Sequence, residues 1–528
     1  MKKLSFVVIL MSLVLRASSQ STTQYLCNPI IPGFHPDPSV CCVGEDFYLV
    51  NSSFQYFPGV PIYHSKDLVN WELIGNVLDR ESQLPLRGAT SWRGIYAPTI
   101  RYHEGMFYMI TTNIGNGGNF MVTATNPAGP WSEPIWLQQQ GIDPSLWFDE
   151  DGKCYMVSNP DNTIMLCEID PKTGKQLTPS CPLWRGTGGR YPEGPHLYKK
   201  DGYYYLLISE GGTELAHRLT IARSRHIDGP YEANPDNPLL TNCCLAGQTK
   251  QLQGTGHGDF VQAPDGSWWV VFLAYRQFEG AYHHLGRETC LAPVEWKEGV
   301  WPVVNGGQPI DTLMACNMLP QQPMKQHRRG SINDGRLGPE WVSLQNPKRP
   351  AEVCKLKLWN DKDAYGIRLY ASESSLTENN RPSFIGIRQE DVAFSLETGL
   401  AALSKGVVEA GLAVYQIHDG HADLFIRKDD SGYSVVLRYR LKSIDVVVKE
   451  EKLDVVPQLV GLRVLCDGKK YRFFYNQKEQ KERWVELGFI DCSLLSTEVV
   501  GGFTGITLGL YAQGDGFAEF RSFDYFLK

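Results

Sequence analysis

Five short segments in the first 300 residues each lead into an apolar stretch, and four of them start with an acidic residue or a histidine. They are Asp37-Pro-Ser-Val, Ala97-Pro-Thr-Ile, Asp143-Pro-Ser-Leu, Glu193-Gly-Pro-His-Leu and His257-Gly-Asp-Phe. Cleavage of a glycosidic bond needs a carboxylic acid that protonates the leaving oxygen and a second carboxylate that attacks or activates water. A third carboxylate raises the pKa of the acid by repulsion and keeps it protonated. Asp37, Asp143 and Glu193 can supply this set if the fold brings them together.

A second repeated element follows each of these segments. Seven to nine residues after each lead residue stands a glycine that precedes an aromatic-rich, β-type run: Gly44, Gly105, Gly152, Gly202 and Gly266. Three of these glycines follow an aspartate, as in a hairpin turn. Repeats at intervals of about 50–60 residues suit one four-stranded propeller blade each.

Five copies therefore predict an all-β fold with a five-bladed β-propeller over residues 25–318. Equivalent positions of successive blades lie on a ring around the propeller axis. The sequence thus predicts that Asp37, Ala97, Asp143, Glu193 and His257 converge.

The pattern changes after residue 318. Residues 319–333, with Pro320, Pro323 and a basic patch, are expected to form a linker. Residues 334–528 contain alternating segments such as Tyr433–Arg440 and Tyr471–Tyr475, with turn signals such as Asp467-Gly468. Short alternating strands without helical periodicity predict a β-sandwich.

The bulk properties restrict the partners. The chain has 528 residues and a formal net charge of −7, which disfavours nucleic acid or an anionic membrane surface as a partner. Lys2 and Lys3 precede an apolar run and small polar residues, so residues 1–20 are expected to be a signal peptide. No second apolar stretch of about 20 residues occurs, so we expect an exported protein, periplasmic or extracellular, without membrane insertion. The thirteen cysteines are interpreted mostly as buried thiols, and the sequence leaves the oligomeric state open.

Other interpretations of single residues remain open. Asp-Pro-Ser also occurs in turns in which the aspartate bonds its own backbone. Clustered carboxylates can bind Ca²⁺, although such a site is usually one compact loop. His257 is a candidate metal ligand, a candidate substrate contact or a buried core histidine.

The motifs around these residues resemble glycoside hydrolase family 43, the β-xylosidases and α-L-arabinofuranosidases. The resemblance is carried by Asn28-Pro-Ile-Ile-Pro-Gly-Phe-His-Pro-Asp37-Pro-Ser, Ser53 to Trp71, Gly141-Ile-Asp143-Pro-Ser-Leu, Arg190-Tyr-Pro-Glu193-Gly-Pro-His-Leu-Tyr and Leu285-Gly-Arg287-Glu-Thr. Leu337-Gly-Pro-Glu-Trp341 and the ending Phe523-Asp-Tyr-Phe526 resemble the accessory domain of two-domain members. The resemblance therefore implies that the sandwich is concanavalin A-like.

The resemblance also implies roles for residues. Asp37 would be the general base, Glu193 the general acid, and Asp143 the residue that tunes and orients Glu193. Inversion of configuration implies base and acid carboxyls about 6.5–9.5 Å apart. The sugar pocket would be lined by Phe54, Tyr96, Ala97, His257, Arg287 and, from the sandwich, Phe503. No cofactor would be required, although a structural Ca²⁺ in the axial cavity near His257 is expected in some members.

The function expected from these features is exo-acting, inverting hydrolysis that releases α-L-arabinofuranosyl or β-D-xylosyl units from plant cell-wall carbohydrate. His35 and Tyr96 stand where some xylosidases carry Asn and Trp, which leaves the sugar open. One alternative is a non-catalytic glycan-binding propeller. Another is a retaining fructan hydrolase, whose two carboxyls would lie only about 5 Å apart.

Overall fold

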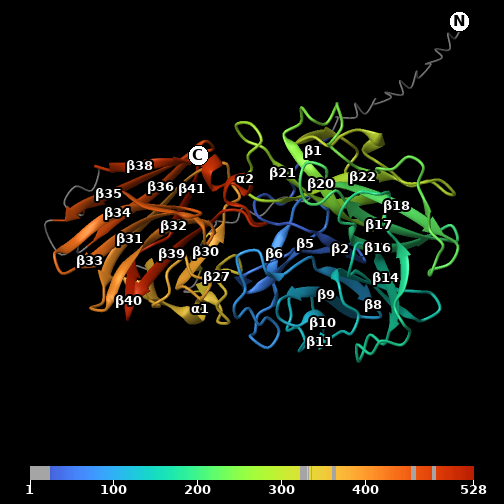
Figure 1. Cartoon of the computed structure of the whole chain (residues 1–528), viewed down its shortest axis with the longest axis horizontal. Helices are drawn as coiled ribbons and strands as arrows, with labels where there is room; N and C mark the ends of the chain where they lie inside the picture. Colours follow the sequence, from blue (N-terminus) through green and yellow to red (C-terminus); the bar gives the residue numbers. More distant parts are fainter. Residues whose placement is uncertain are drawn as a thin grey trace, which may run out of the picture.

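The computed structural model describes residues 24–321, 330, 332–333, 336–359, 364–453, 459–477 and 483–528. They form two β-rich lobes side by side (Figure 1). The expected signal peptide, and most of the expected linker over 319–333, lie outside the described residues.

The first lobe is a propeller of five antiparallel blades, as predicted. The first two blades consist of β2 (Ser39–Val43), β3 (Asp46–Val50), β5 (Gly59–Ser65) and β6 (Glu72–Leu78), then β8 (Thr99–His103), β9 (Met106–Ile114), β10 (Gly118–Ala124) and β11 (Ile135–Trp136), with β7 (Gly94–Ile95) also on β9. The third and fourth consist of β12 (Ile142–Phe148), β13 (Cys154–Asn159), β14 (Ile164–Ile169) and β15 (Cys181–Trp184), then β16 (Glu193–Lys200), β17 (Tyr203–Glu210), β18 (Arg218–Ser224) and β19 (Glu232–Ala233). The fifth consists of β20 (Leu252–Gln262), β21 (Trp268–Arg276), β22 (Glu288–Glu295) and β23 (Val303–Val304).

The repeated glycines form the turns between the first two strands of each blade. All five adopt left-handed backbone angles, with φ between 63° at Gly44 and 86° at Gly266. Residues with a side chain are strained in this conformation, so the hairpin turn favours glycine. The strand after each turn buries its alternate apolar side chains, for example Phe47 and Leu49 of β3. Beyond the last blade, β24 (Leu313–Ala315) returns to pair with β1 (Tyr25–Cys27) near the start of the described chain.

The second lobe is the predicted β-sandwich. One sheet has the order β35 (Ile444–Leu453), β34 (Gly432–Leu441), β33 (Gly420–Asp429), β32 (Val407–Ile417), β39 (Thr507–Gly514), β30 (Phe384–Arg388), β27 (Val342–Leu344) and β4 (Tyr56–Phe57). The other has the order β28 (Cys354–Trp359), β29 (Ala364–Tyr370), β40 (Phe517–Phe520), β31 (Ala393–Leu403), β36 (Val460–Asp467), β37 (Lys470–Gln477) and β38 (Val485–Asp491), with β41 (Asp524–Leu527) on β31. The short elements of this lobe are β25 (Ile332–Asn333), β26 (Arg336–Leu337), α1 (Pro350–Val353), the 3-10 helix η3 (Cys492–Leu495) and α2 (Thr497–Val500).

The two lobes share a sheet, which the repeats do not predict. Strand β4 comes from the first-blade region, yet it pairs with β27 of the sandwich through Tyr56 and Leu344. The hydroxyl of Thr507 donates a 2.8 Å hydrogen bond to the buried Tyr56 hydroxyl. Because main-chain pairing and a buried contact join the lobes, residues of the sandwich can take part in a site on the propeller.

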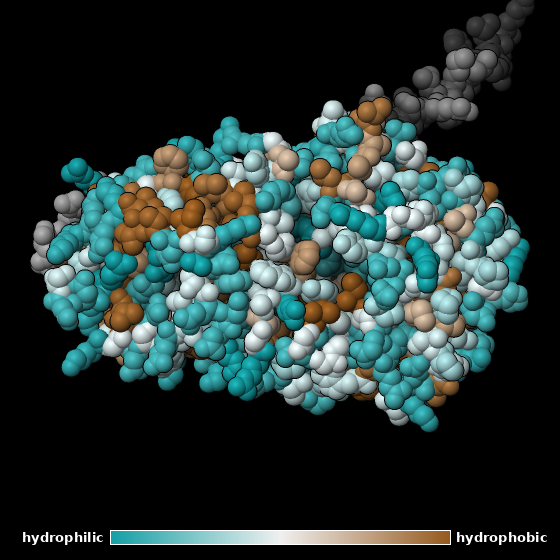
Figure 2. All heavy atoms as spheres, viewed as in Figure 1, coloured by the Kyte–Doolittle hydropathy of each residue, from teal (hydrophilic) through white to brown (hydrophobic). Residues whose placement is uncertain are grey.

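Much of the exposed apolar surface gathers over the sandwich (Figure 2). Edge strand β35 exposes Val446, Val447 and Val448, each by more than 40%. Among the described residues, no helix is long and apolar enough to cross a membrane.

Candidate active site

The first strands of the five blades place one ring of residues around the axis. Ser39, Thr99, Ser145, His196 and Asp259 each hold the same register against the second strand of their blade. Two residues before them stand Asp37, Ala97, Asp143, Gly194 and His257.

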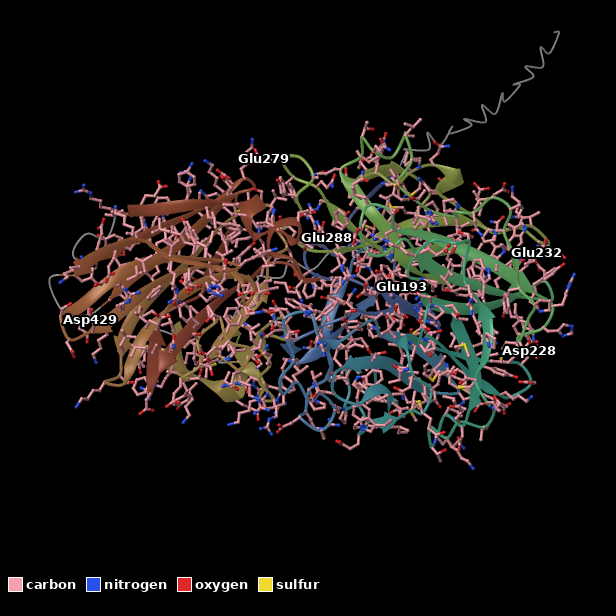
Figure 3. All side chains as sticks on the ribbon, viewed as in Figure 1. Glu193, Asp228, Glu232, Glu279, Glu288 and Asp429 are labelled. Carbon is pink, nitrogen blue, oxygen red and sulfur yellow. The ribbon has the colours of Figure 1, made fainter. Side chains whose placement is uncertain are left out.

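This register corrects the prediction in the fourth blade. The ring position equivalent to Asp37 and Asp143 belongs to Gly194, and Glu193 lies one residue ahead of it, paired with Ser209. The register shifts by a β-bulge between Glu193 and His196, as it does between Ile142 and Ser145 of the third blade. Of the acids labelled in Figure 3, Glu193 lies near the middle of the propeller, whereas Asp228 and Glu232 lie at its outer edge.

Four of the five ring residues, all but Ala97, share an unusual backbone conformation. The φ angle is 53° at Asp37, 54° at Asp143, 59° at Gly194 and 48° at His257. Residues with a side chain pay about 1–3 kcal/mol for such a conformation, which persists where the surroundings impose it and clusters at functional sites. The bulges in the third and fifth blades span Asp143 and His257, respectively, and turn these side chains toward the axis.

Asp37 is held as a carboxylate. Its Oδ1 accepts a 2.8 Å hydrogen bond from Arg287 Nη1, and its Oδ2 accepts a 2.5 Å hydrogen bond from Ser52 Oγ. Burial alone would raise the pKa of Asp37, but Arg287, His257 and Ser52 together hold it below its ordinary value. An ionised, oriented carboxylate of this kind can accept a proton from water, as a general base must.

Asp143 has the opposite environment. Burial, followed by repulsion from Glu193 and then Asp37, raises the pKa of Asp143 well above its ordinary value. The Gly194 amide donates a 3.1 Å hydrogen bond to Asp143 Oδ2. Asp143 and Glu193 are therefore close enough to disfavour simultaneous ionisation, so the pair retains a proton that an acid can deliver.

Sequence reasoning missed His217, which contacts the acid. His217 is fully buried, and its Nε2 lies 3.3 Å from Glu193 Oε1, while its Nδ1 lies 3.2 Å from the Gly254 carbonyl oxygen. A proton on Nδ1 would be donated to that carbonyl oxygen, which leaves the Nε2 lone pair facing the Glu193 carboxyl group. No repeat marks His217, because it precedes the third strand of its blade. Ser52 was also missed, and it lies in the Asn51-Ser-Ser stretch after β3.

The predicted sugar-binding residues form one wall across both lobes. The Arg287 guanidinium lies 5.6 Å from the ring centre of Phe54 and 5.7 Å from that of Phe503, and these two rings stack at 6.1 Å. Phe503 is 39% exposed, but Phe54 is only 3% exposed. Phe54 therefore supports Arg287 and the half-buried Tyr96, whose ring lies 5.3 Å away, and Phe503 offers the open aromatic face. Ala97 is buried beside Tyr96.

His257 forms part of the floor of the candidate active site. Its Nδ1 lies 3.8 Å from Asp37 Oδ1, and its ring lies against Gly194, where an added Cβ would stand 3.1 Å from Cε1. Burial is the main reason why the pKa of His257 is lowered.

The next layer along the axis is filled by a buried ion pair. Asp259 accepts hydrogen bonds from Arg101 (2.8 Å), Ser39 (2.7 Å) and Tyr198 (2.7 Å), and Arg101 Nη2 lies 2.9 Å from His196 Nδ1. The part of the chain that the structure describes contains no group of three or more His, Cys, Asp or Glu side chains arranged to hold a metal ion. The Arg101 guanidinium also occupies this layer, so these residues do not fit a directly coordinated Ca²⁺.

A separate cavity of about 290 Å³ opens beyond this layer, at the far end of the axis. Its lining includes Arg101, Tyr102, Trp147, Phe260 and Trp268. It holds none of the three carboxylates, so it is distinct from the candidate active site.

A buried ionised carboxylate, a second acid with a retained proton and an aromatic wall on a five-bladed propeller define an acid–base glycosidase. The chain matches the family model described as glycosyl hydrolases family 43 over residues 26–302. Residues 332–526 match the model of the beta xylosidase C-terminal concanavalin A-like domain. The protein belongs to glycosyl hydrolase family 43 and is an inverting, exo-acting glycosidase.

Relatives and solved structures agree over almost the whole chain. A non-reducing end alpha-L-arabinofuranosidase of Bacteroides ovatus is 42% identical, over 94% of this chain and 93% of the relative. A xylosidase/arabinosidase of Butyrivibrio fibrisolvens is 40% identical, over 94% and 98%. The solved structure of the Bacteroides ovatus xyloglucan PUL GH43B superposes with a TM-score of 0.88 at 39% identity, covering 96% of this chain and all of that one. A xylan beta-1,4-xylosidase from Bacillus halodurans gives a TM-score of 0.86 at 33% identity, covering 95% and 100%. The resemblance and the fold class are thus confirmed.

Proposed function

We propose that this protein removes single α-L-arabinofuranosyl units from the non-reducing ends or branches of plant cell-wall carbohydrate, and β-D-xylosyl units as a second activity. The observation that carries the reaction is the opposite environment of Asp37 and Asp143. Arg287 and Ser52 hold Asp37 ionised, whereas Asp143 is kept beside Glu193 with a raised pKa. The preference for arabinofuranose is supported by the name of the 42% identical relative, and the second activity by the xylosidase/arabinosidase.

The reaction proceeds in one displacement. Asp37 takes a proton from water, whose oxygen forms a bond to the anomeric carbon as the glycosidic bond breaks. Glu193 transfers its proton to the departing oxygen. After the reaction Asp37 is protonated and Glu193 is ionised, and proton exchange with solvent restores both starting states. Asp143 and His217 position the Glu193 carboxyl, while Arg287 and Phe503 hold the terminal sugar.

Two measurements test the proposal. The initial rate on 4-nitrophenyl α-L-arabinofuranoside should exceed the rate on 4-nitrophenyl β-D-xyloside. A higher rate on the xyloside would mean that xylosidase, not arabinofuranosidase, is the main activity. Proton NMR of the first-released sugar should show the inverted anomer. A retained anomer contradicts direct displacement and favours a retaining enzyme.

We also propose that the protein is exported to the periplasm or the medium. The support is the pattern of Lys2 and Lys3, the apolar run Leu4–Leu15 and the small residues after it. N-terminal sequencing of the protein from its native host should begin near residue 20. A chain that retains residues 1–20 in the cytoplasm contradicts export.

A further inference from the structure

An aromatic side chain stands open to solvent immediately before the general acid. Tyr191 is 55% exposed, lies two residues before Glu193 and adopts φ = 53°. A left-handed conformation at a bulky residue is a genuine outlier that needs support from its surroundings.

Buried hydrogen bonds fix the segment that precedes Tyr191. The Glu210 carboxylate, which is fully buried, accepts from the Thr187 amide (2.9 Å), the Thr187 hydroxyl (2.8 Å) and the Gly189 amide (2.9 Å). Arg190 and Gly211 exchange two hydrogen bonds, of 2.8 Å from the Gly211 amide and 3.1 Å from Arg190 Nε. These hydrogen bonds hold the backbone that leads into Tyr191 in a fixed position.

The Tyr191 ring lies on glycine backbone. A Cβ added to Gly212 would stand 3.1 Å from Tyr191 Cδ2, so the absence of a side chain at Gly212 lets the ring pack there. The next residue, Thr213, accepts a 3.2 Å hydrogen bond from Arg287 Nη1, the group that also binds Asp37. Tyr191 is thus linked to the catalytic wall through Gly212 and to the acid through Pro192.

We propose that Tyr191 is the platform of a leaving-group subsite, which binds the sugar that follows the scissile bond. Glu193 protonates the oxygen that joins the terminal sugar to this second sugar, so the second sugar must leave past Glu193. The Tyr191 ring remains 55% exposed, although the Arg190 guanidinium lies over it at 5.5 Å from the ring centre, and its exposed surface suits the apolar face of a sugar ring. Tyr191 determines specificity in this arrangement and takes no part in proton transfer. The inference rests on the proposed function, because it assumes that Glu193 is the acid.

The test compares two leaving groups on the same terminal sugar. The first substrate is an arabinofuranosyl disaccharide, which places a sugar beyond the scissile bond, and the second is arabinofuranosyl fluoride, which places none. For Tyr191→Ala we expect kcat/KM on the disaccharide to fall about tenfold, equivalent to about 1.4 kcal/mol. On the fluoride we expect no change, and Tyr191→Trp should retain the disaccharide activity.

Two further variants control for folding. Tyr191→Gly removes the ring and also relieves the left-handed strain, so it should reproduce the disaccharide defect without a loss of thermal stability. Tyr102→Ala removes an exposed tyrosine (40%) at the far end of the axis and should leave kcat/KM unchanged on both substrates. Equal losses on both substrates, or no loss on the disaccharide, would overturn the subsite. A wild type that cleaves neither of these substrates but cleaves xylobiose and xylosyl fluoride would mean that the terminal sugar named in the proposed function is wrong. In that case the Tyr191 variants are compared on xylobiose and xylosyl fluoride instead.

Discussion

The Gly194 amide donates a hydrogen bond to Asp143 Oδ2 at 3.1 Å, and this bond ties the residue beside the general acid to a carboxyl group whose pKa is raised. Gly194 holds the ring position itself, while Glu193 reaches in from the bulge. The acid is thereby placed by backbone geometry as well as by its own side-chain contacts.

Replacement of Gly194 by alanine should therefore impair catalysis beyond its effect on the backbone. The new Cβ would stand 3.1–3.3 Å from three atoms of the His257 ring. Gly44→Ala is the matched control, because Gly44 has a similar φ of 63° but no atom within 4 Å of the added Cβ. Both variants should lose about 1–2 kcal/mol of stability from the left-handed conformation. Only Gly194→Ala should also lower kcat/KM, and equal kinetics for the two variants would show that the His257 contact is irrelevant.

Substrates with different leaving groups can distinguish the role of the general acid from that of the general base. Glu193→Gln should lower kcat on a disaccharide about 10²–10⁴-fold. On a dinitrophenyl glycoside the loss should be much smaller, because that leaving group needs no proton. Asp37→Asn should be equally defective on both substrates. Glu232→Gln, on the outer edge of the propeller, serves as control for removal of a charge. A full loss by Glu193→Gln on the activated substrate would exclude it as the acid.

The lowered pKa of Asp37 predicts the acidic limb of the pH profile. Ser52 donates to the ionised form, so its hydroxyl helps to lower the pKa of Asp37. Ser52→Ala should raise that pKa, and the acidic limb of kcat/KM should move to higher pH. Ser53→Ala is the control, since Ser53 is equally buried but accepts from the Val60 amide. A limb that stays in place for Ser52→Ala would mean that Asp37 is not the group that titrates there.

The buried pair Arg101–Asp259 should govern stability rather than chemistry. Burial would raise the pKa of Asp259, but Arg101 and His196 outweigh it and hold that pKa well below the ordinary value. A carboxylate with a lowered folded pKa stabilises the fold above its unfolded pKa of about 3.9, and this contribution is lost as pH falls through the folded value. Arg101→Met leaves the carboxylate buried without its cation and should cost about 3–5 kcal/mol at pH 7.

The sign of the pH dependence provides the check on this pair. Without Arg101, burial should raise the pKa of Asp259 above its unfolded value, so protonation would stabilise the variant. Its melting temperature should then rise between pH 7 and pH 5, whereas that of the wild type should show no such gain. Asp259→Asn added to Arg101→Met should restore part of the stability at pH 7. A double variant as unstable as the single one would contradict the argument.

The sequence by itself determined the blades and the identity of the carboxylates. A glycine that permits a left-handed turn, followed by alternating aromatic and apolar residues, specifies a hairpin through local conformational preferences. Five such units at regular spacing leave a closed propeller as the fold that buries all of their apolar faces. For the same reason Asp37, Asp143, Glu193 and His257 could be expected at one end of the axis before any coordinates were known.

Only the tertiary structure decided how these residues differ. Asp37 and Arg287 are 250 residues apart and meet because the last blade closes on the first. Glu193 lies one residue ahead of the ring position, and His217 reaches Glu193 from just before β18, a strand that no repeat marks. Phe503 reaches Arg287 because the lobes are joined through β4 and β27. Protonation states follow from burial and from charges that are distant in sequence, so the repeats could place the acids but could not distinguish the ionised Asp37 from Asp143, whose pKa is raised.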